Sequence, residues 1–187
     1  RRQRQMCIRD RRMGATNSQV YLGNPYTVAA AAVAGPQVAA PHSPANSAPV
    51  AEVEGVKIDQ AYIGACTGAK LIDLRMAAEI LEGRDVAKGA RLLIAPASQK
   101  DTAVAAADGT LATLTAAGAI MMPSGCGACA GYGAGVLAEH EVCIASTARN
   151  FKGRMGATNS QVYLGNPYTV AAAAVAGEIK DPREFLR

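Results

Sequence analysis

Two cysteines three positions apart raise the first chemical question of this sequence. Cys126 and Cys129 lie among four glycines in the stretch PSGCGACAGYG, residues 123–133. A third cysteine, Cys66, lies in the glycine-flanked stretch IGACTG. Cys66 and the Cys126/Cys129 pair each follow an apolar run that is typical of a strand. Because the carboxyl ends of parallel strands meet at one edge of a sheet, we expect the three thiols to converge there.

Three kinds of thiol chemistry are candidates for these residues, and they differ in how many ligands they need. Structural zinc normally needs four protein ligands, and only one C-x-x-C pair is present. A thioredoxin-like redox pair would use C-G-A-C without Cys66, although Gly125 stands where such motifs usually carry an aromatic residue. An iron–sulfur cluster would use all three, since glycine-rich loops let backbone N–H groups approach the sulfides. A cluster with three cysteine ligands leaves one iron open to act as a Lewis acid.

The remaining cysteines and one histidine have simpler interpretations. Cys143 lies inside the apolar run EVCIAST, where we expect a small buried side chain. His42 lies in a proline-rich stretch and is expected to be a solvated loop residue. Cys7 belongs to a duplicated segment, described below, and is excluded from the site.

Two arginines supply a second candidate function. Arg149 and Arg154 lie in the stretch TARNFKGRMG, directly after the predicted strand EVCIAST. Guanidinium groups suit bidentate binding of carboxylates. The alternative is a solvated basic loop with no ligand. From the residues alone both interpretations stay open, and carboxylate binding gains weight only if the cysteines hold a catalytic cluster.

The elements that must position these residues alternate between strand and helix from residue 56 onward. VKIDQAYIG, RLLIAPAS, AIMMPSG and EVCIAST are predicted strands, and KLIDLRMAAEILEGR has helical spacing that ends at Gly83. DTAVAAADGTLATLTAAG is predicted to be a helix with Asp101 as N-cap, and GYGAGVLAE to open a helix. NSQVYLGNPYTVAAAAVAG is predicted to be a loop followed by a helix that ends at Gly177. The pattern predicts an α/β fold, a three-layer αβα domain over residues 56–187 with a mainly parallel sheet.

Residues before this domain have a different character. Residues 12–35 recur unchanged as residues 154–177, and RRQRQMCIRDR before them resembles a translated sequencing adapter. Structural repeats drift in sequence and stack as many units, so we interpret residues 1–35 as a chimeric or duplicated segment and expect it to be disordered. Residues 36–55 are rich in proline and small residues, which predicts an extended linker.

Charge and hydropathy exclude two classes of partner. The chain has a net charge of +4, and six arginines against one aspartate in residues 1–12 account for it, so the rest is close to neutral. We therefore expect no nucleic-acid partner. No long uninterrupted apolar run and no signal-peptide pattern are present, so we expect a cytoplasmic protein without a membrane span.

The ordered combination of motifs is similar to a known family. IGACTGAKLIDLR, APAS, PSGCGACAGYGAGVLAEHEVCIASTARNFKGRMG and VYLGNPYTVAAAAVAGEIKDPREFL resemble the 3-isopropylmalate dehydratase large subunits of the aconitase superfamily, over about residues 41–187. The resemblance implies a hydro-lyase of leucine biosynthesis that isomerises 2-isopropylmalate to 3-isopropylmalate by dehydration and rehydration. It also implies that Cys66, Cys126 and Cys129 ligate a [4Fe-4S] cluster and that Arg149 and Arg154 bind substrate.

Two positions and several segments depart from the family pattern. Gly68 and Ala148 stand where the family commonly has asparagine. A related hydro-lyase of the aconitase, homoaconitase or dimethylmalate type therefore remains an alternative, as does a thiol redox module. The family's catalytic histidine, acidic residues and serine base lie in further domains and in a small swivelling subunit that forms the heterodimer. No catalytic residue is assigned here, and we expect this fragment alone to be inactive.

Overall fold

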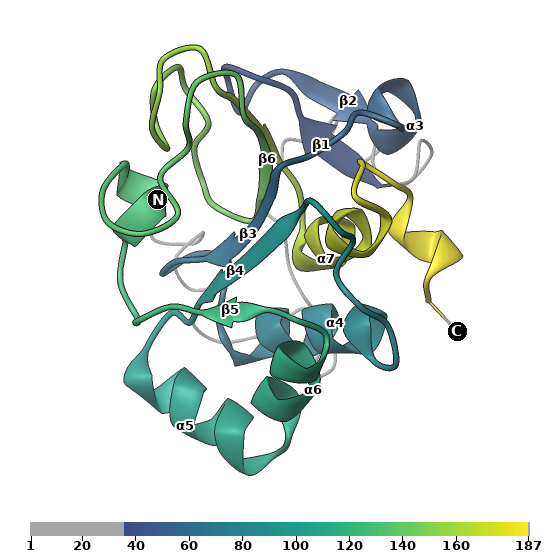
Figure 1. Cartoon of the computed structure of the whole chain (residues 1–187), viewed down its shortest axis with the longest axis vertical. Coiled ribbons are helices and arrows are strands. Elements are labelled where there is room, and N and C mark those ends of the chain that lie inside the picture. The colour runs from purple at the N-terminus through teal and green to yellow at the C-terminus, as the bar shows by residue number, and fades with distance from the viewer. Residues whose placement is uncertain (1–35, 187) are drawn as a thin grey trace, which may run out of the picture. The chain divides into compact units, whose positions relative to one another are not determined.

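Seven strands form one sheet in the computed structural model, which describes residues 36–186 (Figure 1). The strands are β1 Gln37–Ala39, β2 Ser47–Pro49, β3 Gln60–Gly64, β4 Arg91–Ala95, β5 Ile120–Met121, β6 Val142–Ala145 and β7 Gln161–Leu164. The α-helices are α3 Val50–Val53, α4 Leu71–Leu81, α5 Gln99–Ala107, α6 Thr110–Ala116 and α7 Pro167–Ala176, and the 3₁₀ helices are η1 Gly127–Ala130 and η2 Pro182–Glu184.

The strand order is β2-β1-β7-β6-β3-β4-β5, and all pairs from β7 to β5 are parallel. The chain runs outward from β3 through β4 to β5 and then returns to β6 on the other side of β3. Ligands of open α/β sheets bind at such a reversal, outside the carboxyl ends of the strands. The predicted α/β class with a mostly parallel sheet is confirmed.

The two faces of the sheet are covered differently. Residues of α4, α5, α6 and α7 form one apolar cluster with the inward side chains of β3, β4 and β6. A second cluster on the other face joins Tyr62 and Leu93 to Leu137 and Met155, which come from loops. Within residues 36–186 the second helical layer of the predicted three-layer arrangement is therefore replaced by η1 and loops. Glycines with positive φ at 131, 133 and 135 explain why GYGAGVLAE forms no helix.

Residues 36–55 contain two strands of the sheet and the short helix α3, so the predicted extended linker is wrong. β1 and β2 form an antiparallel hairpin, and Ala39 pairs with Leu164 of β7. Pro49 ends β2 at the edge of the sheet, where a missing N–H is tolerated. Residues 1–35 lie outside the described residues, so the prediction for that segment is untested.

Helix boundaries follow local capping chemistry. The stretch predicted as one helix from Asp101 is two helices, and its N-cap is Ser98, whose hydroxyl accepts from the Asp101 N–H at 3.1 Å. α7 begins after its Asn166 cap and ends at Gly177 with φ 74°, the end that the sequence predicts. The residues before it were predicted to be a loop, but four of them form β7. Its fully buried alanines allow the helix to lie close to the sheet.

None of the helices described between residues 36 and 186 has the length and apolar character that a membrane crossing requires.

Candidate functional site

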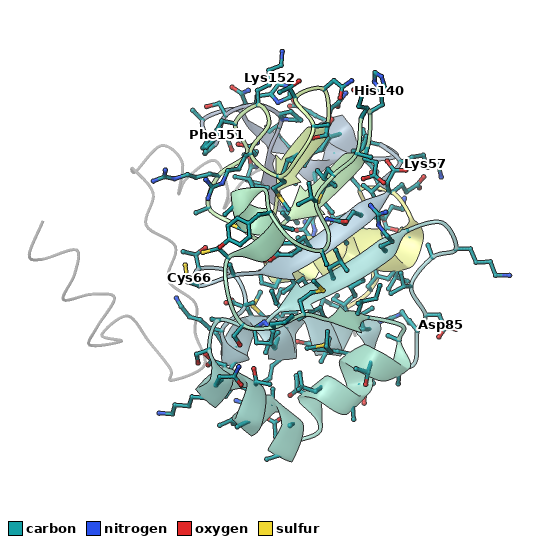
Figure 2. All side chains as sticks on the ribbon, turned by 60° about the vertical axis from the view of Figure 1, so that its left-hand side comes forward. Lys57, Cys66, Asp85, His140, Phe151 and Lys152 are labelled. Carbon is teal, nitrogen blue, oxygen red and sulfur yellow. The ribbon has the colours of Figure 1, made fainter. Side chains whose placement is uncertain are left out.

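Three segments that carry the predicted site residues leave the sheet at its carboxyl edge. Cys66 follows β3 by two residues, the Cys126/Cys129 segment follows β5, and the Arg149–Arg154 loop follows β6. Figure 2 shows Cys66 at the end of β3, on the side of the molecule away from Lys57 and His140. Since β3 and β6 are neighbours at the reversal of strand order, the fold brings these segments to the expected position.

The Cys66 loop is fastened to the end of β6. Ser146 Oγ donates to the Gly68 carbonyl at 2.7 Å and accepts from the Gly64 N–H at 3.2 Å. Gly68 lies so close that a Cβ there would be 1.9 Å from the Ser146 carbonyl oxygen. The loop thus presents Cys66, an exposed free thiol, between two anchored glycines. The close approach also explains why position 68 has no side chain.

The Cys126/Cys129 segment lies over the tyrosine of β3. Tyr62 Oη donates to the Cys126 carbonyl at 3.4 Å, and Cys129 N–H donates to the same carbonyl at 2.9 Å. Burial, with a smaller contribution from the adjacent Cys129, raises the pKa of Tyr62 to about 12. The phenol therefore stays protonated and remains a donor. Cys126 is exposed and Cys129 is half-buried, and both are free thiols.

The chain just after the Cys126/Cys129 segment is joined by backbone contacts to the end of the arginine loop and the residues that follow it. Leu137 N–H donates to the Met155 carbonyl at 2.8 Å, and the Ala157 N–H donates to the Leu137 carbonyl at 3.0 Å. A Cβ on Gly156 would be 2.3 Å from the Leu137 oxygen, and one on Gly131 would be 3.1 Å from the Arg154 oxygen. Residues 131–137 and 154–157 therefore pack against each other, and Leu137 and Met155 lie in one apolar cluster on the same face of the sheet.

The two arginines have no carboxylate partner among residues 36–186. Arg149 is exposed, and no ion pair to it is formed within that range. The Arg154 guanidinium lies over the Phe151 ring at 5.4 Å, and its Nε is buried with no hydrogen-bond partner in the described part of the chain. A buried donor without a partner is costly, so this group is suited to an anion.

Asn150 holds this loop against the edge hairpin. It is fully buried, and its Nδ2 donates to the carbonyls of Ala40 and Val162 at 2.9 Å each and of Ala39 at 3.3 Å. These bonds join the turn after β6 to both β1 and β7. Arg149 is therefore next to a rigid anchor in the sequence.

The donor set fits a cluster better than a single metal ion. Within the described residues, no three His, Cys, Asp or Glu side chains are grouped as the ligands of one ion. In a four-iron cluster each cysteine binds a different iron, so the thiols surround the cluster instead of meeting at one point. One free thiol on the loop after β3 and two on the segment after β5 suit that arrangement. The identity of the ligands stays a prediction.

The remaining cysteine and the two histidines of residues 36–186 lie elsewhere. Cys143 is fully buried in β6, as predicted, and burial raises the pKa of its thiol. His140 precedes β6, and its Nε2 lies 3.3 Å from Asn159 Nδ2. His42 is exposed in the loop between β1 and β2, as expected.

Three residues that support the site were not found from the sequence. Tyr62 looks like any apolar strand residue, and its contact with Cys126 spans 64 positions. Ser146 and Asn150 stand in the motif region, but only the fold shows their partners. A hydroxyl directly after a strand at the reversal of strand order was the one available signal for Ser146.

Comparison with known proteins gives one family. The model of the Aconitase family (aconitate hydratase) matches residues 37–177. The chain is 52% identical over 151 residues to the 3-isopropylmalate dehydratase large subunit 1 of Methanopyrus kandleri, a match that covers 81% of this chain and 36% of that protein. It is 52% identical over 141 residues to the 3-isopropylmalate dehydratase large subunit of Mycolicibacterium smegmatis (75% and 33%) and 49% identical over 150 residues to the homoaconitase large subunit of Thermus thermophilus (80% and 36%). The chain thus spans about a third of the length of these curated relatives.

Proposed function

Because this chain belongs to the aconitase family, we propose that it is the cluster-binding part of a hydro-lyase large subunit. The reaction is the dehydration and rehydration that isomerises 2-isopropylmalate to 3-isopropylmalate, a step of leucine biosynthesis. The observation that carries the proposal is that the Cys66 loop, the Cys126/Cys129 segment and the arginine loop follow the parallel strands β3, β5 and β6 and so all leave the sheet at its carboxyl edge. The names of the relatives support the choice of reaction.

Cys66, Cys126 and Cys129 would hold a [4Fe-4S] cluster. When bound, such a cluster supplies an iron without a protein ligand, which draws electrons from a substrate hydroxyl. The protein's own contribution is to position the thiols. Ser146 and Gly68 hold the Cys66 loop, and Tyr62 supports Cys126 from below.

Arg149 and Arg154 would bind the substrate carboxylates. Arg154 has an unpartnered Nε, and its stacking on Phe151 restricts the plane of the guanidinium. A fixed guanidinium loses little freedom when a carboxylate binds, so it orients the 2-hydroxy acid for reaction. Positive charge at these positions also stabilises negative charge that develops on the substrate.

The groups that move protons would come from elsewhere. The relatives are named large subunits, which supports a small-subunit partner in a heterodimer. The remaining two thirds of the large subunit and that partner would supply the catalytic acid and base. We therefore expect no turnover by this chain alone. A cytoplasmic location, where thiols stay reduced, would suit the exposed Cys66 and Cys126.

A homoaconitase-type substrate is the second candidate. Relatives from Thermus thermophilus and Methanocaldococcus jannaschii that are named homoaconitase large subunits are 49% and 48% identical to this chain. Ala148, next to Arg149, lacks the amide that the family commonly presents there, so a different carboxylate pattern could be recognised.

Anaerobic reconstitution of the chain with iron and sulfide tests the cofactor. We expect about four irons and four sulfides per chain, with an electron paramagnetic resonance signal after reduction. Cys66→Ser should lower the iron content, whereas the matched control Cys143→Ser should not. Absence of iron together with a reversible disulfide between Cys126 and Cys129 would contradict the proposal and favour the redox module.

Turnover is tested in a chimera. Residues 37–177 replace the matching segment of the Methanopyrus kandleri large subunit, which is assayed with its small subunit. We expect 2-isopropylmalate to be converted, and Arg154→Lys to raise KM because lysine cannot make the bidentate contact. Conversion of homocitrate and not of 2-isopropylmalate would favour the second candidate.

A further inference from the structure

One hydroxyl connects both ends of the loop that carries Cys66. Ser146 Oγ accepts from the Gly64 N–H at 3.2 Å, where β3 ends, and donates to the Gly68 carbonyl at 2.7 Å, where the loop ends. Only three residues separate these two glycines. A single side chain therefore holds both ends of the loop by hydrogen bonds.

The position of Ser146 is itself fixed by the sheet. Its N–H donates to the Tyr62 carbonyl at 3.0 Å, which extends the parallel pairing of β3 with β6 by one bond. The Ser146 carbonyl lies against Gly68, where a Cβ would be 1.9 Å away. The loop is thus held on one side by two hydrogen bonds and on the other by direct backbone contact, and neither arrangement leaves it free to rotate.

We propose that Ser146 is a positioning residue that fixes the Cys66 loop in the geometry needed for cluster binding. The role of the cluster in this inference rests on the proposed function, whereas the hydrogen bonds from Ser146 to the Cys66 loop do not. Alanine at 146 keeps the backbone bond to Tyr62 and removes both hydroxyl bonds. Cys66 would then explore conformations from which it cannot ligate, so the cluster would be lost faster.

Ser160 provides a matched control. Ser160 is buried, whereas Ser146 is half-buried, and the Ser160 hydroxyl also donates to a backbone carbonyl, that of Ala157, at 2.7 Å. Loss of either hydroxyl removes a bond to a backbone carbonyl, but only Ser146 also accepts from an N–H, and only Ser146 touches the Cys66 loop. Ser160→Ala therefore reports the general cost of losing such a hydroxyl away from that loop.

The first measurement needs no cluster. Hydrogen exchange of the Gly64 amide is followed by NMR in the iron-free chain, because that amide donates to Ser146 Oγ. We expect exchange about tenfold faster in Ser146→Ala, as the loss of one buried hydrogen bond gives, and unchanged in Ser160→Ala. Ser146→Thr keeps a hydroxyl and should restore slow exchange.

The second measurement uses the reconstituted chain. The rate of iron loss to a chelator should rise about tenfold in Ser146→Ala and return toward the wild-type value in Ser146→Thr. The inference would be overturned if Ser146→Ala and wild type had equal rates of amide exchange and of iron loss. It would also be overturned if Ser146→Ala lost the whole fold while Ser160→Ala stayed folded, because Ser146 would then have a general structural role. A wild-type chain that takes up no iron would instead refute the proposed function. Exchange of the Gly64 amide would still test whether Ser146 holds the loop.

Discussion

Gly68→Ala is the substitution whose effect follows most directly from the geometry. The added Cβ would be 1.9 Å from the Ser146 carbonyl oxygen, 2.7 Å from its carbonyl carbon and 2.6 Å from its Oγ. Carbon and oxygen atoms in proteins approach to about 3.3 Å, so the loop must move by more than an ångström. The nearest atoms belong to the backbone of a sheet strand's end, which cannot rotate away.

The expected cost follows from overpacking. A forced shift of this kind destabilises a protein by about 1–3 kcal/mol, and the movement also stretches the Ser146 bond to the Gly68 carbonyl. We therefore expect about 2 kcal/mol, or a fall in Tm of about 4–8 °C for a domain of this size. Iron content after reconstitution should fall as well, because Cys66 is two residues away.

Urea and thermal unfolding followed by circular dichroism measure the effect. Gly165→Ala is the matched control, since neither glycine has a left-handed φ and the nearest atom to a Cβ at 165 is a side-chain carbon 3.3 Å away. That variant should lose less than about 1 kcal/mol. Equal stability of Gly68→Ala and Gly165→Ala would refute the argument from close approach.

Three further predictions test the supporting structure. Asn150→Ala should lower the free energy of unfolding by about 3 kcal/mol, because its buried side-chain amide donates to three backbone carbonyls, and an unfolding midpoint equal to wild type in urea would contradict this. Cys143→Ala should cost about 1 kcal/mol by leaving a small void and should leave iron content unchanged; a loss of iron would make Cys143 a ligand. Hydrogen bonds from Thr110 and Arg75 lower the pKa of Asp108 from 3.8 to about 2, so its contribution to stability is present above pH 3.8 and is lost as pH falls toward 2. The free energy of unfolding, measured as a function of pH, should decline less steeply in that range for Asp108→Asn than for wild type. Identical slopes would contradict a stabilising role of the hydrogen bonds from Thr110 and Arg75.

Local patterns account for the parts of the fold that could be read in advance. Helical spacing predicted α4, and the Gly177 terminus of α7 follows from its left-handed conformation. Strands followed by helices predicted the parallel sheet. That topology placed Cys66 and the Cys126/Cys129 pair at one edge, because parallel strands all end on the same side.

Long-range pairing decided what local patterns could not. β1, β2 and β7 are short, and the prolines near β2 indicate a linker until antiparallel pairing with β7 is seen. The loops that replace a second helical layer depend on left-handed glycines such as Gly131 and Gly135. Apolar periodicity predicts which side chains are buried, but it does not predict whether helices or loops cover that face of the sheet.

The site divides in the same way. The types and order of its cysteines and arginines were determined by the sequence, because thiolate and guanidinium chemistry belongs to the side chain itself. Only the tertiary structure decided which residues hold the cysteine loops in place. Ser146 meets Gly64 and Gly68 across 82 and 78 positions, and Tyr62 meets Cys126 across 64, and no local signal reaches over such distances. Those contacts exist only because the sheet places β3 and β6 side by side.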